Sequence, residues 1–223
     1  LGGRVHWVGA AVPAGLTDFT QAHVFFHPAP GQAGIPVSQY DAFTGGWVNV
    51  ERYVPWLGSQ LAAAGREQVL FVPYLRGGEY FQLGLLGTDP IARITALLGA
   101  VQQALYPGAA MAPTLKVLGA SSFSVGVAAL SRFIAKVGGT GLLREAYDFD
   151  GLYSNSADKM IARIPGGVFR KYAQSAGSTL ARTGVFLAPQ PRWRNHPDRP
   201  ATGHATHALM PNLFYHAAWL GSD

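Results

Sequence analysis

The sequence predicts an α/β fold with a mostly parallel central sheet flanked by helices on both faces. Short apolar runs typical of buried strands alternate along the chain with longer segments whose apolar residues recur at helical spacing. Near residue 120, one such run also turns directly into an apolar segment of helical length. No long linker and no repeat of fixed period divides the 223 residues, so we expect a single domain over residues 1–223.

Each element is predicted from its own local pattern. The segments with strand composition are residues 4–11, 21–27, 68–74, 115–120, 145–150, 168–174 and 184–188. The segments with helical spacing are residues 48–64, 89–105, 125–134 and 209–220. Asp89 followed by Pro90 is a typical helix start, since Asp caps and proline fits the first turn. Residues 76–86 are expected to form a loop, of which 80–86 could cover an apolar substrate.

Composition excludes several classes of protein. Hydrophobic residues make up 48% and charged residues 13% of the chain, which is too apolar for a disordered protein. The absence of cysteine removes disulfides, thiolate metal sites and a cysteine nucleophile. The net charge is +5, but the basic residues are scattered without a run of three, so we expect no nucleic-acid partner. No apolar run reaches the length of a membrane span, and no signal-peptide pattern is present, so a soluble chain is expected. The compartment and the oligomeric state stay open.

The strand-to-helix corner predicts a nucleophilic serine. Ser124 stands at the corner in Ser122-Phe-Ser-Val-Gly126, where the usual nucleophile elbow has Gly-x-Ser-x-Gly. The nucleophile's backbone is strained in such a turn, and the residues two positions away must be small so that strand and helix can approach. A second register would place Ser122 at the corner, flanked by Ala120 and Ser124 without glycine. In a non-catalytic interpretation, a serine hydroxyl here only caps the helix.

Four features in this order resemble the α/β-hydrolase-fold superfamily of serine esterases and lipases. They are the loop at residues 27–31 after an early strand, the elbow at Ser124, Asp150 at the end of a later strand, and His207 before the last helix. The resemblance covers most of the chain and rests on the order of the parts. It implies a three-layer sandwich and a Ser-His-Asp triad, which in this family runs Ser, Asp, His along the chain.

The resemblance also implies the role of each residue. Ser124 would attack a carbonyl, with an imidazole taking its proton and a carboxylate orienting that imidazole. The oxyanion would be bound by two backbone N–H groups, those of Val125 and Ala29. Ala29 is preferred within its loop because the flanking Pro28 and Pro30 have no N–H.

The sequence offers alternative residues for the acid and for the histidine of the predicted triad. Asp148 lies two residues before Asp150 on the same strand, and Asp198 is a more distant candidate. His204 lies three residues before His207 in the same segment. The sequence therefore predicts the triad Ser124, His207 and Asp150, with Ser122, His204 and Asp148 as alternatives.

A metal site competes for the same histidines. His204 and His207 are three residues apart and His196 is near, but no acidic metal-binding motif accompanies them. We expect no metal and no cofactor. The predicted function is hydrolysis of carboxylic esters, lipid-like or aryl, through an acyl-enzyme. The alternatives are a non-catalytic binding domain of the same fold, and an amidase or peptidase.

Overall fold

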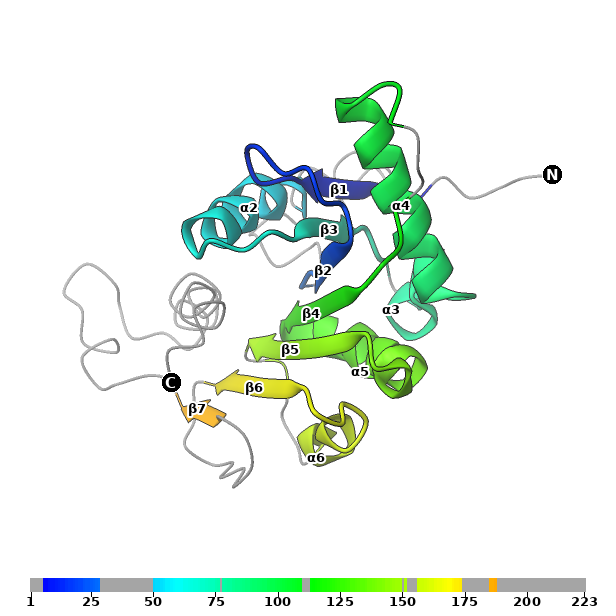
Figure 1. Ribbon diagram of the computed structural model, residues 1–223. Coiled ribbons are helices and arrows are strands. Elements are labelled where there is room, and N and C mark those ends of the chain that lie inside the picture. The colour runs from blue at the N-terminus through cyan, green and yellow to red at the C-terminus, as the bar shows by residue number, and fades with distance from the viewer. Residues whose placement is uncertain are drawn as a thin grey trace, which may run out of the picture.

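The computed structural model describes residues 6–28, 50–76, 78–109, 113–149, 151, 156–173 and 185–187. In this part of the chain, seven strands form one sheet in the order β1-β3-β2-β4-β5-β6-β7 (Figure 1). They are β1 (Val8–Ala11), β2 (Gln21–Phe26), β3 (Val69–Pro73), β4 (Val117–Phe123), β5 (Leu143–Phe149), β6 (Val168–Ala173) and β7 (Val185–Leu187). Strand β1 pairs antiparallel with β3, and every other pair is parallel. The predicted α/β class with a mostly parallel sheet is therefore confirmed.

The register brings the carboxyl ends of the central strands to one level. Phe26 of β2 pairs with Ser122 of β4, and Ser122 pairs with Asp148 of β5. Sites in parallel sheets form outside the carboxyl ends of the strands. This edge of the sheet is therefore the place to look for a functional site.

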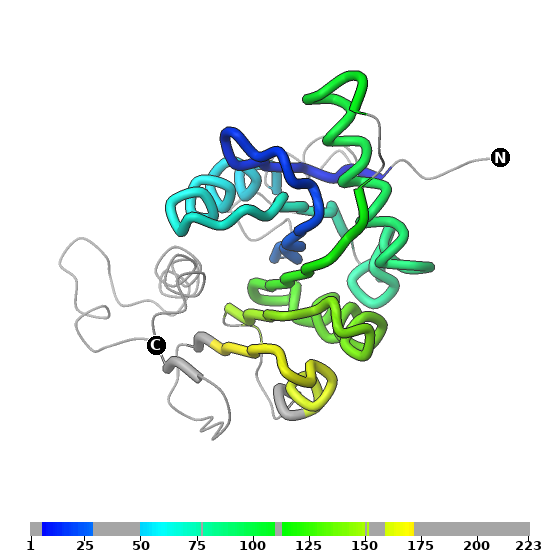
Figure 2. Tube along the Cα trace, viewed as in Figure 1, coloured from blue at the N-terminus to red at the C-terminus, as the bar shows by residue number. Residues whose placement is uncertain are grey.

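Helices cover both faces of the sheet (Figures 1 and 2). Within the described residues, the α-helices are α2 (Tyr53–Ala63), α3 (Glu79–Gln82), α4 (Pro90–Leu105), α5 (Val127–Val137) and α6 (Ser156–Ile161). Short 3₁₀ helices are η3 (Gly84–Leu86), η4 (Ser124–Gly126) and η5 (Gly138–Thr140). Helix α2 packs on one face, and its buried Leu57 and Leu61 belong to one apolar cluster with Leu70 and Phe25 of the sheet. The other helices contribute to a larger cluster on the opposite face.

The alternation of side chains in the strands explains the two clusters. Ala120 of β4 and Ala146 of β5 belong to the cluster under α5, whereas Phe123 and Tyr147 belong to the cluster under α2. Successive side chains of a strand point to opposite faces. The strands are buried on both sides, as expected for a parallel sheet covered by helices.

Most predicted elements are present, with small shifts of their ends. Strand β4 runs to Phe123, three residues beyond its predicted end. The predicted cap of α4 is present, because Asp89 accepts a hydrogen bond from the Ala92 N–H at 3.0 Å. The expected loop at 76–86 was wrong in part, because α3 and η3 form there. Helix α6 was not predicted. The helix predicted at 209–220 lies outside the described residues.

A search of the described residues for membrane spans finds no single helix that is long and apolar enough. The bent pair Glu79–Leu86 and Pro90–Leu105 together passes on length and composition alone.

Candidate active site

Ser124 is held in a strained backbone conformation at the end of β4. Its φ is +55°, in the left-handed region that residues other than glycine rarely adopt. Such a conformation costs about 1–3 kcal/mol and persists only where the surroundings enforce it. Phe123 before it is still extended, and Val127 after η4 begins α5. The predicted corner is therefore present, with Ser124 at its sharpest point.

Gly126 explains why the corner needs a small residue two positions later. A Cβ atom built there would lie 2.2 Å from the carbonyl oxygen of Phe26 and 2.8 Å from that of His27. These are backbone atoms at the end of β2, and they cannot move aside as a side chain could. Only glycine lets the first turn of the helix approach the chain that leaves β2.

Ser122 occupies the position two residues before the corner, and its side chain is engaged. Its Oγ donates a hydrogen bond to Asp148 Oδ1 at 2.9 Å, and both residues are fully buried. By strand alternation both side chains point to the α5 face, together with Ala120 and Ala146. Ser122 is therefore a regular residue of β4 that ties this strand to β5.

Gly151, which follows β5 along the chain, lies against the corner. A Cβ atom on Gly151 would lie 2.5 Å from the Ser124 carbonyl oxygen and 2.6 Å from Asp148 Oδ1. Gly151 therefore brings the chain that follows Asp150 against the backbone of the serine turn.

The loop proposed for the oxyanion begins at a buried histidine. His27 Nδ1–H donates to the Pro28 carbonyl at 2.6 Å, and His27 Nε2 accepts from the Leu75 N–H at 2.9 Å. Burial lowers the pKa of His27 to about 4, although the hydrogen bond to Pro28 opposes this. His27 is therefore neutral at pH 7, with a fixed tautomer.

Of the remaining predicted site residues, only Val125 lies in the described part of the chain. Val125 is described and is 38% exposed beside Ser124. The residues that lie outside the described part of the chain are Ala29, Asp150, His196, Asp198, His204 and His207. The structure thus brings together Ser124, Val125, Ser122 and Asp148, and the rest of the predicted site stays a prediction.

A buried polar cluster on the α2 face was missed by the sequence analysis. His23 Nε2 lies 2.8 Å from Ser121 Oγ, and Glu145 accepts hydrogen bonds from Arg66 at 3.1 Å and from the Tyr147 hydroxyl at 2.5 Å. Burial alone would raise the pKa of Glu145, but His23, Tyr147 and Arg66 together lower it to about 2. These residues come from β2, β4, β5 and the segment after α2. No local pattern reveals the cluster, because the strand order alone makes them neighbours.

Among the residues that the structure describes, no group of three or more His, Cys, Asp or Glu side chains could hold a metal ion. No protein-family model matches the chain, and no curated protein sequence matches it.

Proposed function

We propose that this protein is a serine hydrolase of carboxylic esters, built on an α/β-hydrolase-like three-layer sandwich, with Ser124 as the nucleophile. The observation that carries the proposal is the left-handed backbone of Ser124 at the junction of β4 and α5. A strained serine at a strand-to-helix turn, at the carboxyl edge of the sheet, is the geometry of a nucleophile elbow. Ser124 itself is 3% exposed in this structure. A serine that only capped the helix would need no such strain.

The surroundings of Ser124 support the same proposal. The chains leaving β2 and β5 both pack against the serine turn, as the close approaches at Gly126 and Gly151 demonstrate. These are the two segments expected to supply the oxyanion loop and the acid. A nucleophile, an oxyanion loop and an acid on three neighbouring strands need no domain movement to meet.

The proposed reaction follows from these roles. Ser124 Oγ attacks the ester carbonyl while His207 takes its proton, and Asp150 orients and stabilises the imidazolium. The N–H groups of Val125 and Ala29 bind the oxyanion. The protonated His207 then gives its proton to the leaving alcohol. Water, activated by the same histidine, hydrolyses the acyl-enzyme and releases the acid.

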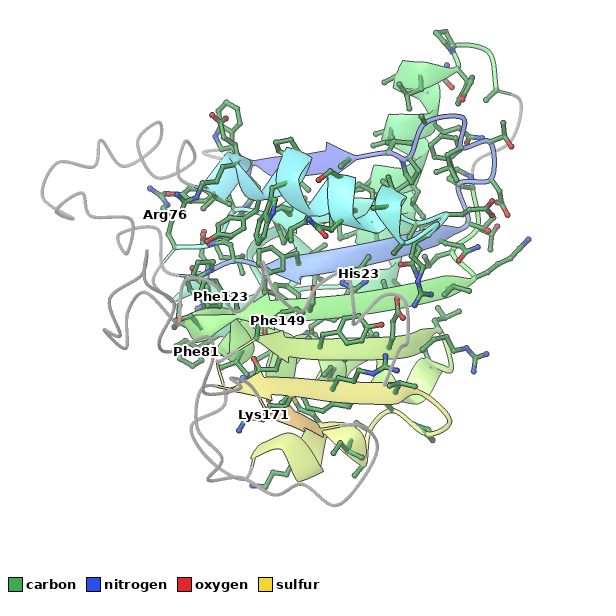
Figure 3. All side chains as sticks on the ribbon, turned by 90° about the vertical axis from the view of Figure 1, so that its left-hand side faces the viewer. His23, Arg76, Phe81, Phe123, Phe149 and Lys171 are labelled. Atoms are coloured by element: carbon green, nitrogen blue, oxygen red, sulfur yellow. The ribbon has the colours of Figure 1, made fainter. Side chains whose placement is uncertain are left out.

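Exposed apolar side chains favour a lipid-like or aryl substrate. Phe81 is 62% exposed on α3, and α3 packs against α5. Figure 3 shows Phe81 near the same edge of the sheet as Phe123, at the end of β4. The partly exposed Val125 directly follows the proposed nucleophile. An apolar acyl chain would cover the side chains of Phe81 and Val125, and the removal of this apolar surface from water would strengthen its binding.

A fluorophosphonate probe tests the proposal directly, together with hydrolysis of p-nitrophenyl esters. The wild-type protein should be labelled at Ser124, and Ser124→Ala should lose labelling and at least about 10³-fold in kcat. Ser131→Ala, a serine replacement in α5, should keep both activities. Asp150→Asn and His207→Ala should each lower kcat strongly with the fold intact.

Other outcomes point to the alternative functions. A folded wild-type protein that is neither labelled nor hydrolytic would support a non-catalytic binding domain of this fold. Labelling of Ser124 with faster cleavage of amides than of matched esters would indicate an amidase or peptidase.

A further inference from the structure

We propose that Asp148 is a positioning residue for Ser124, because its carboxylate holds β4 and β5 together at the last step before the serine turn. The inference rests on the proposed function and gives Asp148 a role other than that of the catalytic acid. Asp148 acts through Ser122, through Gly151 and through the backbone of the turn, and it does not touch the substrate.

The hydrogen bond of Asp148 lies near the end of the β4–β5 ladder. Ser122 Oγ donates to Asp148 Oδ1 at 2.9 Å, and the two residues pair in register. The pair of Phe123 and Phe149 follows (Figure 3), and the chain then turns at Ser124. Both Ser122 and Asp148 are fully buried, so bulk water does not compete for the bond. The bond therefore fixes the spacing of the two strands directly before the strained residue.

The same carboxylate lies against a residue that contacts the turn. A Cβ atom built on Gly151 would lie 2.6 Å from Asp148 Oδ1 and 2.5 Å from the Ser124 carbonyl oxygen. It would also lie 2.8 Å from Cβ of Val127, the first residue of α5. Such close approaches need a residue without a side chain. A shift of the carboxylate would therefore be passed through Gly151 to the backbone of Ser124.

The strained backbone of Ser124 needs support from both neighbouring strands. Its φ of +55° persists only where the surroundings enforce it. Strands β2 and β5 are the two neighbours of β4 in the sheet. On the β2 side, Gly126 lies against the backbone carbonyls of Phe26 and His27. On the β5 side, the Asp148 carboxylate supplies the matching constraint.

The role of positioning residue differs from that of a catalytic acid in what it requires of the side chain. A catalytic acid must orient the histidine and stabilise its positive charge, and for this it must be negatively charged. Holding the Ser122 hydroxyl requires only an acceptor oxygen, which an asparagine side chain also has. The charge and the acceptor oxygen of Asp148 can therefore be tested separately.

The test measures the rate of fluorophosphonate labelling at Ser124. Asp148→Ala should lower this rate about tenfold to a hundredfold, because a small displacement of a reacting group is enough for such a loss. Asp148→Asn, which keeps the acceptor oxygen, should retain at least about a third of the wild-type rate. The KM for a p-nitrophenyl ester should change less than about twofold in both variants. Because Asp148→Asn also removes a charge next to the buried Lys171 in the sheet register, circular dichroism first establishes that each variant is folded.

Ser122→Ala removes the same hydrogen bond from its donor side. The labelling rate should fall to a similar extent as in Asp148→Ala. The double variant Ser122→Ala/Asp148→Ala should be no slower than the slower single variant, because both changes remove one and the same bond. Multiplied losses in the double variant would overturn the inference.

Tyr147→Phe is the matched control. Tyr147 precedes Asp148 in β5, and its buried hydroxyl donates to Glu145 on the opposite face of the sheet. The change removes a buried hydrogen bond of the same strand on the face away from Ser122 and Asp148. It should lower stability and leave the labelling rate unchanged.

Four results would contradict the proposed role of Asp148. Equal labelling rates for Asp148→Ala and the wild type would mean that the bond does not position Ser124. A loss of about 10³-fold or more in Asp148→Asn would identify Asp148 as the catalytic acid instead. An equal loss in Tyr147→Phe would reduce the effect to general destabilisation. Absence of labelling in the wild type would refute the proposed function itself, and the inference with it.

Discussion

The Ser122 hydroxyl donates a hydrogen bond to Asp148 Oδ1 at 2.9 Å, two residues before the strained Ser124. The position that a nucleophile elbow usually gives to glycine is thus used to tie β4 to β5. Asp148, an alternative candidate for the catalytic acid, has this bond on the α5 face of the sheet, under the helix that begins at Val127.

This pairing predicts a structural effect of Asp148. Asp148→Ala should lower the free energy of unfolding by about 1–3 kcal/mol, because it leaves the buried Ser122 hydroxyl without this acceptor. The removal of both groups in Ser122→Ala/Asp148→Ala should cost less than the sum of the single changes. Urea unfolding of the four proteins measures this coupling. Strictly additive costs would contradict the importance of the bond.

The strained backbone at Ser124 predicts that a glycine there would make the protein more stable than an alanine would. Ser124→Gly removes the penalty of a positive φ, whereas Ser124→Ala retains it. The glycine variant should be more stable than the alanine variant by about 1 kcal/mol, and both should be inactive. Thermal and urea unfolding give the comparison. A more stable alanine variant would indicate that Ser124 is not strained in solution.

Gly126 should tolerate no side chain. Gly126→Ala would place a methyl group against two backbone carbonyls and should cost about 1–3 kcal/mol or more, with loss of labelling at Ser124. Gly139→Ala is the control, since a Cβ atom there meets nothing within 4 Å. Its free energy of unfolding should change by less than about 0.5 kcal/mol. Equal costs for the two variants would refute the close approach at the corner.

Two buried histidines predict a loss of stability in mild acid. Burial lowers the pKa of His27 to about 4 and also lowers that of His23, where Glu145 opposes the shift. As the pH is lowered, both histidines take up protons near pH 6.5 in the unfolded chain, and only at a lower pH in the folded chain. The stabilisation by the neutral histidines is therefore present above pH 6.5 and falls as the pH drops below it. For His27 the loss extends toward pH 4, by up to about 1.4 kcal/mol per pH unit.

The contribution of His27 to this loss can be isolated. His27→Gln should flatten the dependence of unfolding free energy on pH between 6.5 and 4, even if it lowers stability at pH 7. His6→Gln, at a partly exposed position, serves as the control. An unchanged slope in His27→Gln would mean that His27 is not buried in the neutral form.

Phe81 should affect substrate preference if the proposed function holds. Phe81→Ser should lower kcat/KM for long-chain acyl esters about threefold to tenfold and leave acetyl esters unchanged, because only a long chain reaches its ring. Leu105→Ser removes an exposed apolar side chain at the far end of α4 and should change neither. A uniform loss across chain lengths would argue against contact with the acyl chain.

Local patterns were enough for most of the secondary structure. The apolar run before residue 120 and the small residues after it predicted the turn at Ser124, and Asp89-Pro90 predicted the start of α4. These features depend on a few consecutive residues, whose backbone preferences are local. Helix α3 was missed because the glycines before it resemble a loop, and its burial through Tyr80 supplies stability that no local pattern displays.

The α/β class, the alternation of strands and helices, and the serine at the corner could all be predicted from the residue pattern alone. The folded chain was needed to show that β2 lies between β3 and β4, that Ser122 donates to Asp148, and that Tyr80 donates to the Pro28 carbonyl across 52 positions of the chain. The physical reason is that strand and helix propensities act between near neighbours. A hydrogen bond of about 3 Å between distant residues depends instead on how every element between them packs.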